Sequence, residues 1–375
     1  MRAYVFTNPA LERHAGQFVW LALDNEKKSN APLRKKLPVD AWPTYLLVDP
    51  VTEKVLVRWV GSATVTQLAT MFDETYGSYT SPSDTLLAEA DRLFGATRYE
   101  EAAAAYARVL ERAPKGWSGY ARTVDARLYA LTRSAQFEAC VRQAEEALPR
   151  VAGVPSFASV AASGLDCAMS LPDSNLHREA MIRSFEAQAR SAIEDSTLVI
   201  AADDRSGIYG MLVDARHTLG DSLGERATLE KWAAFLEGEA AKAKTPDARA
   251  VFDSHRLSAY LELGQPERAV PMLQASERDL PDDYNPPFRL ATAYKAMKKY
   301  PESMAALERA LPKAYGPRKV RILRLRTDVY VATGDAAAAD RSRRETLAYA
   351  EALPEEQRPE STIAALKKEL EPAKQ

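Results

Sequence analysis

The stretch GQPERAVPML, residues 264–273, decides the fold because its pattern returns along the chain. A Gly-Gln-Pro bend leads into a helical segment with a small residue at position 269 and a leucine at position 273. The same frame returns at 300–307 (YPESMAAL) and, in shorter form, at 334–339 (GDAAAA). The small residues and one tyrosine per preceding helix repeat at intervals of 34 and 36 residues (303 − 269 and 339 − 303): Ala269, Ser303 and Ala339, and Tyr260, Tyr294 and Tyr330. This spacing predicts a repeated helical hairpin.

The period resembles that of tetratricopeptide repeats, over residues 84–114 and 251–350. A helical hairpin cannot bury its apolar face alone, so hairpins stack, with small residues where two helices touch. The pattern is degenerate between these ranges, where 137–148 fits a second hairpin and 156–195 and 203–244 predict helix pairs of irregular length. We therefore expect about seven hairpins over residues 84–354, followed by a capping helix and tail at 355–375.

A second informative stretch is VDAWPTYLLVD, residues 39–49. The residue before a proline is pushed out of the helical region and 44–48 is rich in strand formers, so Pro43 is expected at a strand entrance, as a candidate cis peptide. The neighbouring pattern predicts a fully buried strand at 18–24 (FVWLALD), a polar helical segment at 26–36, strands at 45–49 and 55–60, and a helix at 65–76.

This order resembles the thioredoxin family over residues 1–76, with Pro43 in the place of that family's cis-proline. The family's first strand and its Trp-Cys-x-x-Cys helix start are absent here, and the resemblance puts that strand between 18–24 and 45–49, in the middle of the sheet. Loss of a central strand leaves two rows of backbone groups without partners. We therefore expect the natural protein to start upstream of Met1. The alternative is a redox-dead remnant whose two flanking strands pair directly.

The predicted fold class is mainly α: a truncated, bacterial thioredoxin-like α/β domain at 1–76, a polar linker at 77–83, and an α-solenoid of tetratricopeptide-type hairpins. The length of 375 residues suits two or three domains, and 46% hydrophobic with 27% charged residues is typical of a globular protein. A formal net charge of −2 gives no overall footprint for nucleic acid, and no apolar run approaches the roughly 18 residues that a membrane-inserted helix needs.

The two cysteines, Cys140 and Cys167, lie far apart in helical patterns, and we expect buried thiols rather than a disulfide. The first residues lack the features of a secretion signal. As written, the chain is expected in the cytoplasm; it is expected in the periplasm or envelope if an export signal lies upstream.

No constellation for catalysis, metal or cofactor binding emerges from the sequence. Gly220-Asp221-Ser222-Leu223-Gly224 matches G-x-S-x-G, but that nucleophile motif needs a preceding strand, whereas 210–219 is helical in pattern. The four histidines are scattered without ligand spacing, and no glycine-rich phosphate loop occurs. We predict no catalytic residue, no metal and no cofactor.

Two surfaces are candidates for peptide binding. The basic stretch RKVRILRLR, residues 318–326, places Arg321 and Arg324 on one helical face, and Lys295 of the neighbouring hairpin would join them in a clamp for carboxylates. The alternative is a solvated face balanced by acids such as Asp328. The edge at Trp42, Pro43 and Thr44 would accept an extended peptide.

The long connection 279–290 (DLPDDYNPPFRL) offers acids that would cap the next helix; the alternative is a recognition lip at the groove.

The sequence therefore predicts a non-enzymatic scaffold that binds protein or peptide partners. The alternative is a thiol-disulfide oxidoreductase or redox chaperone whose Cys-x-x-Cys lies upstream of Met1, because no cysteine occurs in the first 139 residues and exchange needs an accessible thiolate.

Overall fold

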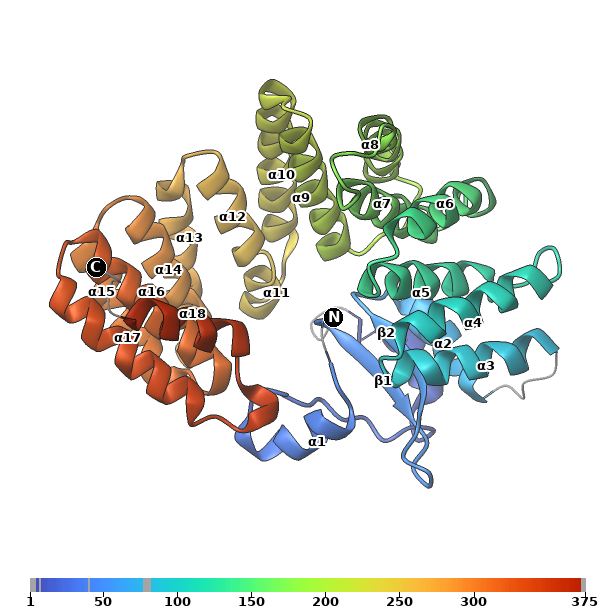
Figure 1. Cartoon of the computed structure of the whole chain (residues 1–375), viewed down its shortest axis with the longest axis horizontal. Helices are drawn as coiled ribbons and strands as arrows, with labels where there is room; N and C mark the ends of the chain where they lie inside the picture. Colours follow the sequence, from blue (N-terminus) through green and yellow to red (C-terminus); the bar gives the residue numbers. More distant parts are fainter. Residues whose placement is uncertain (1–4, 7, 40, 77–81, 372–375) are drawn as a thin grey trace. The chain divides into compact units, whose positions relative to one another are not determined.

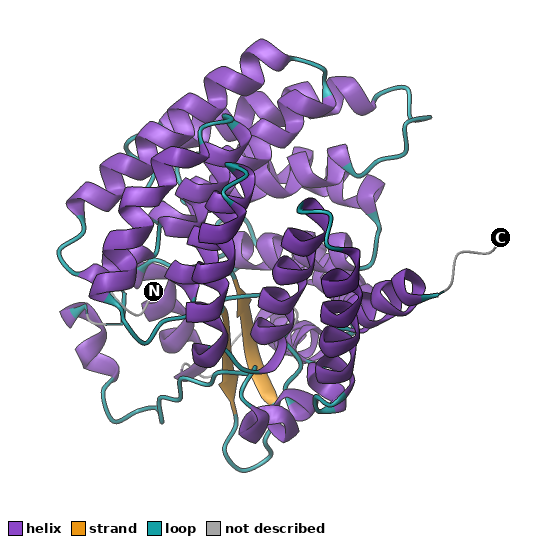
Figure 2. Cartoon of the chain, turned by 90° about the vertical axis from the view of Figure 1, so that its left-hand side faces the viewer, coloured by secondary structure: helices purple, strands orange, loops and turns teal. Residues whose placement is uncertain are grey.

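The computed structural model describes residues 5–6, 8–39, 41–76 and 82–371. The chain forms two compact units, one of Met1–Val19 with Val39–Trp232 and one of Trp20–Pro38 with Ala233–Gln375. Helices make up nearly all of the regular structure, and the strands of the described ranges form one two-stranded sheet (Figures 1 and 2). The predicted mainly α fold class is confirmed.

The first unit holds a hairpin of strands followed by helices. Its elements are η1 (Pro9–His14), β1 (Thr44–Val48), β2 (Val55–Val60), α2 (Val65–Tyr76), α3 (Pro82–Gly95), α4 (Tyr99–Arg112), α5 (Tyr120–Arg133), α6 (Phe137–Ala147), η3 (Leu148–Arg150), α7 (Ser156–Met169), α8 (Arg178–Glu194) and α9 (Ala202–Thr218). Helix α10 (Ser222–Lys242) continues from this unit into the second.

The second unit contains η2 (Lys28–Asn30), α1 (Ala31–Lys36), α11 (Pro246–Ala250), α12 (Asp253–Glu262), η4 (Pro266–Arg268), α13 (Ala269–Asp279), α14 (Asn285–Ala296), α15 (Tyr300–Ala310), η5 (Leu311–Lys313), α16 (Gly316–Ala332), α17 (Ala336–Glu351), η6 (Glu355–Gln357) and α18 (Glu360–Leu370). In both units consecutive helices pair as antiparallel hairpins, and successive hairpins pack on one another. The predicted helix pairs at 156–195 and 203–244 are confirmed as α7/α8 and α9/α10.

The hairpin bends share one local geometry, which explains the sequence period. At Gly264, Lys298 and Gly334 the backbone turns into the left-handed region, with φ of 71°, 59° and 76°. After each bend an amide donates back across the helix end, as from Gln265 N–H to the Tyr260 carbonyl at 2.8 Å. The repeated tyrosines Tyr260, Tyr294 and Tyr330 all provide this carbonyl.

The strand hairpin of the first unit agrees with prediction around Pro43. The Trp42–Pro43 peptide is cis, and β1 pairs antiparallel with β2, with an irregularity between Leu47 and Val48. The carboxylate of Asp49 accepts the amides of Val51 and Thr52 at 2.8 Å and closes the turn. Behind the sheet, Val57, Leu68, Met71 and Phe72 form a small core.

The strand expected at 18–24 is a wrong prediction. These residues are in neither strand nor helix; Val19, Leu21 and Leu23 are 88%, 74% and 49% exposed, and the described part of β1 pairs with β2 alone. A strand forms only against a neighbouring ladder, and none of the described residues pairs with this apolar run in a sheet. The comparison with thioredoxin therefore finds no support beyond the two-stranded sheet, and direct pairing of 18–24 with 45–49 does not occur. The helical segment expected at 26–36 is split into η2 and α1.

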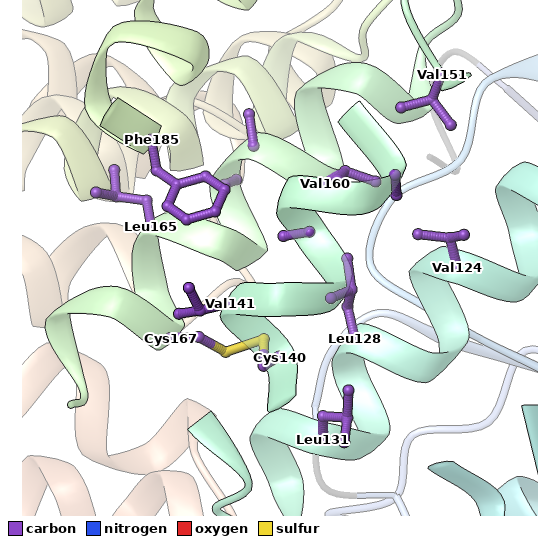
Figure 3. Packing of buried hydrophobic residues seen from close by; sticks show 14 of the residues in the cluster. Val124, Leu128, Leu131, Cys140, Val141, Val151, Val160, Leu165, Cys167 and Phe185 are labelled. Carbon is purple, nitrogen blue, oxygen red and sulfur yellow. A yellow bond between two sulfur atoms is a disulfide. The ribbon is translucent and has the colours of Figure 1, made fainter. Parts of the chain in front are cut away.

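The expectation of free thiols is also wrong, because Cys140 of α6 and Cys167 of α7 form a disulfide with their Cα atoms 6.2 Å apart. Figure 3 shows this bond among the packed side chains of Val141, Leu128 and Leu131. Both cysteines are fully buried. The separation of the two cysteines in the sequence does not show that α6 and α7 lie side by side.

The remaining boundary predictions stay predictions. The linker at 77–83 falls largely on residues 77–81, which lie outside the described residues, as do 372–375 of the predicted tail.

Candidate peptide-binding site

Helix α16 of the second unit carries the predicted basic stretch, and packing fixes its orientation. Val320, Ile322 and Leu323 are at most 2% exposed, whereas the side chain of Arg321, between the first two, points away from the core and is 58% exposed. The helix begins at Gly316-Pro317, directly after Tyr315. Arg318 therefore lies in the first turn.

Arg318 binds two carboxylates of a segment almost 300 residues away in sequence. Its Nη2 lies 2.9 Å from both carboxylate oxygens of Asp24, and its Nε donates to Glu26. The Tyr315 hydroxyl donates to Asp24 at 2.5 Å, and Arg321 lies 3.4 Å from the Glu26 carboxylate. Hydrogen bonds between a guanidinium and a carboxylate are charge-assisted and therefore stronger than those between neutral groups.

Two aromatic rings position the Arg318 guanidinium. Its central carbon is 4.7 Å from the centre of the Tyr315 ring and 5.5 Å from that of Tyr284, which precedes α14. The side chain of Arg318 is 21% exposed. Stacking and partial burial both strengthen the pairing with carboxylates.

Main-chain groups of the same segment are bound as well. The Gln357 side chain, in η6, donates to the carbonyls of Asn25 and Lys27 at 3.0 and 2.9 Å. Gly316 has φ +55°, and a Cβ there would overlap the Glu26 carbonyl, so the close approach requires glycine. Residues 24–27 are thus bound through both their side chains and their backbone.

The electrostatics of Asp24 follow from these contacts. Partial burial acts to raise its pKa, but hydrogen bonds from Tyr315 and the Glu26 amide, together with the Arg318 charge, hold the pKa below its ordinary value. Burial acts to lower the pKa of Arg318, yet its bonds to Glu26 and the charges of both acids raise it. Both groups are therefore charged at neutral pH.

The three residues predicted for the repeat clamp have different partners. Arg321 lies beside Glu26, whereas Arg324 binds Glu369 of α18 at 2.9 and 3.0 Å and Lys295 lies 3.2 Å from Asp328. The structure brings only Arg321 to the segment 24–27. Two contact residues that the sequence prediction left out, Tyr315 and Arg318, adjoin or belong to the basic stretch; no sequence signal pointed to Gln357 or to the acids 24 and 26.

The other predicted surface, Trp42-Pro43-Thr44, lies at the start of β1 in the first unit. The Trp42 side chain is 62% exposed, the Pro43 carbonyl accepts the Gly61 amide at 2.9 Å, and the Thr44 hydroxyl donates to the Ala41 carbonyl at 2.7 Å. Its peptide-binding role stays a prediction.

The motif at 220–224 lies at the turn between α9 and α10, in agreement with the helical pattern predicted for 210–219. Helix α9 precedes it and Ser222 is the first residue of α10, while Asp221, rather than the serine, accepts the Gly224 amide at 2.9 Å. In the connection 279–290, Asp283 accepts the amide of Asn285 at 2.9 Å where α14 begins, which agrees with the capping interpretation.

A search of the described residues finds no group of three or more His, Cys, Asp or Glu side chains that could hold a metal ion. Among the described helices, none has the length and apolar character to cross a membrane.

Comparison with known proteins gives matches in structure alone. No family model matches the sequence, and no curated protein matches it. A tetratricopeptide repeat protein from Parabacteroides merdae aligns with 78% of this chain and 98% of its own at 11% identity, with a TM-score of 0.48. The C-terminal part of a repeat protein from Cytophaga hutchinsonii aligns over 72% and 96% at 14% identity and a TM-score of 0.41. A Rap protein in complex with Competence and Sporulation Factor aligns over 76% and 80% at 10% identity and a TM-score of 0.41.

Proposed function

We propose that this chain is a non-enzymatic scaffold that binds protein or peptide partners on its helical repeats. One observation carries the proposal: side chains from two separate parts of the second unit, the start of α16 and η6, bind a peptide segment, residues 24–27, by its carboxylates and its carbonyls. Carboxylates and backbone carbonyls occur in every polypeptide, so the same surface can bind a segment of another protein.

The predicted clamp of Lys295, Arg321 and Arg324 extends this proposal along α16. Arg321 is the member of the clamp that lies beside the segment 24–27, and its side chain is 58% exposed. A partner with further acids would compete with Asp328 and Glu369 for Lys295 and Arg324. The Trp42-Pro43-Thr44 edge is proposed as a second docking surface, since the Trp42 side chain is exposed.

The alternative function, thiol-disulfide exchange by a thioredoxin-like part, rests on the order of turn, strands and helix over residues 42–76. It would require a Cys-x-x-Cys upstream of Met1 in the natural protein, because Cys140 and Cys167 are buried in a disulfide. That disulfide also supports an oxidising compartment such as the periplasm or envelope.

The scaffold proposal is tested with a peptide array of acidic turns, probed with the whole chain. Arg318→Ala with Arg321→Ala should abolish binding, whereas Arg344→Ala should not, because that exposed arginine pairs with Asp340 within one helix. Equal binding by the double variant would contradict the proposal.

An insulin-reduction assay separates the two functions. The scaffold predicts no turnover by this chain. Turnover would overturn it, and activity gained only in an upstream-extended protein would support the oxidoreductase.

A further inference from the structure

The segment 24–27 is a preorganised turn as well as a bound segment. Its own Asp24 carboxylate accepts the Glu26 amide at 3.0 Å, and the Lys27 amide donates to the Asp24 carbonyl at 3.2 Å. The Asn30 side chain donates to that same carbonyl at 2.7 Å. A short peptide with the pattern Asp-x-Glu can therefore present the same shape without the rest of the chain.

The surface that holds this turn reads a defined pattern. Tyr315 and Arg318 contact the carboxylate of Asp24, and Arg318 and Arg321 contact that of Glu26. Gln357 donates to the carbonyl of the one residue that follows each acid, Asn25 and Lys27. The residue between the acids, Asn25, is read there through its backbone carbonyl. The matching ligand is an acidic turn with two carboxylates one residue apart.

The bound turn is held mainly by polar contacts. The apolar residues just before it, Leu21 and Leu23, are 74% and 49% exposed, so they add little buried surface. The side chains of Asp24 and Glu26 are 27% and 16% exposed. Charged contacts near water exchange readily, whereas a packed apolar core does not.

We infer that residues 24–27 are an internal ligand, and that the partner of this site is a protein with an Asp-x-Glu turn that must displace them. The inference rests on the proposed scaffold function. Because the internal turn is tethered to the same chain, its effective concentration is about millimolar or higher, so it lowers the apparent affinity of every external ligand. The N-terminal segment thereby regulates the peptide site of the repeats.

The test uses a fluorescent peptide of residues 21–30, LALDNEKKSN, and three forms of the whole chain. These are the wild type, the variant Asp24→Asn with Glu26→Gln, and that variant with Arg318→Ala added. The amide substitutions keep the shape of the turn and leave every binding residue in place, so they release the site without altering it.

We expect the peptide to bind the released variant about tenfold or more tightly than the wild type, and the triple variant without measurable affinity. A peptide with Asn and Gln for its two acids should bind none of the three, and Arg344→Ala in the released background should bind like its parent. Circular dichroism verifies that each variant is folded.

Three outcomes would overturn the inference. If the peptide bound the wild type and the released variant with equal affinity, residues 24–27 would not compete for the site. The peptide site itself, and with it the scaffold proposal, would stand. Absence of binding to the folded released variant would remove the Asp-x-Glu specificity; array binding by other peptides would then keep the scaffold alone. Concentration-dependent dimers in a mixture of wild type and released variant would mean that the turn of a second copy of this chain, and not a partner protein, occupies the site.

Discussion

The helices α5–α8 and the bound turn at 24–27 show two opposite ways of fixing polypeptide. Along α7, Val160, Leu165 and Cys167 are completely buried, and Phe185 of α8 belongs to the same apolar cluster (Figure 3). Each such apolar side chain contributes about 1.5–3 kcal/mol, and the packing is close. The turn is held by charges that keep contact with water. The first region is built to persist and the second to exchange.

The comparison is tested most strongly at the disulfide. Replacing Cys140 and Cys167 together by serine should lower the free energy of unfolding by about 3.5 kcal/mol, because the disulfide closes a loop with a sequence separation of 27 residues. Urea denaturation measures the change. A reductant should destabilise the wild type by a similar amount and leave the double variant unaffected. A loss below about 0.5 kcal/mol would show that apolar packing alone fixes this region.

Close packing itself is tested at Gly164 of α7. A Cβ at this position would overlap the ring of Phe185, which is 1% exposed, so Gly164→Ala should cost about 1–3 kcal/mol. The matched control is Gly207→Ala in α9, where a Cβ meets nothing within 4 Å. The control should be neutral or stabilise by up to about 1 kcal/mol, since alanine favours a helix more than glycine does. If both substitutions changed the free energy of unfolding equally, the contact between α7 and α8 would accommodate an extra methyl group without strain.

The sequence predicted the repeats well because their signal is local. The bends at 264, 298 and 334 need a left-handed residue, a turn and small residues at fixed spacing, and all of these lie within one hairpin. The proline turn at Pro43 and the helix at 65–76 were predicted for the same reason.

The wrong predictions all depend on contacts between distant residues. The run at 18–24 has strand propensity, but a strand needs a partner that propensity does not supply. The disulfide requires α6 and α7 to lie side by side, and pairing of Arg318 with Asp24 joins residues 294 positions apart. The basic helix of the site was therefore predictable from the sequence, whereas the segment 24–27 that it binds was not.

The two regions should also respond to pH with opposite sign. Asp125 of α5 is half-buried and accepts the hydroxyls of Ser156 and Ser159 of α7 at 2.9 and 2.7 Å, and burial raises its pKa to about 7 despite these bonds. The folded protein then holds a proton that the unfolded chain releases above about pH 4, so stability is lost as the pH rises towards 7. Between pH 7.5 and 5.5 we expect a gain of about 2 kcal/mol in the free energy of unfolding on acidification. Asp125→Asn, which does not titrate, should remove that gain; an unchanged pH profile would contradict the assignment.

The smallest expected effect lies at the turn, where the sign is reversed. The pKa of Asp24 is lowered in the bound turn, against the raising effect of burial, by Tyr315, the Glu26 amide and Arg318. Its contribution to binding is therefore complete above the ordinary pKa of about 4 and is lost as the pH falls through the lowered value. Peptide 21–30 should bind the released variant equally at pH 7 and pH 5, and several-fold more weakly at pH 3. A peptide with Asn at position 24 should bind weakly throughout and lose less affinity on acidification, and circular dichroism at pH 3 verifies that the helices persist. Weakening already between pH 7 and pH 5 would mean that Asp24 is not the group that responds, and that the turn is not held by its charge.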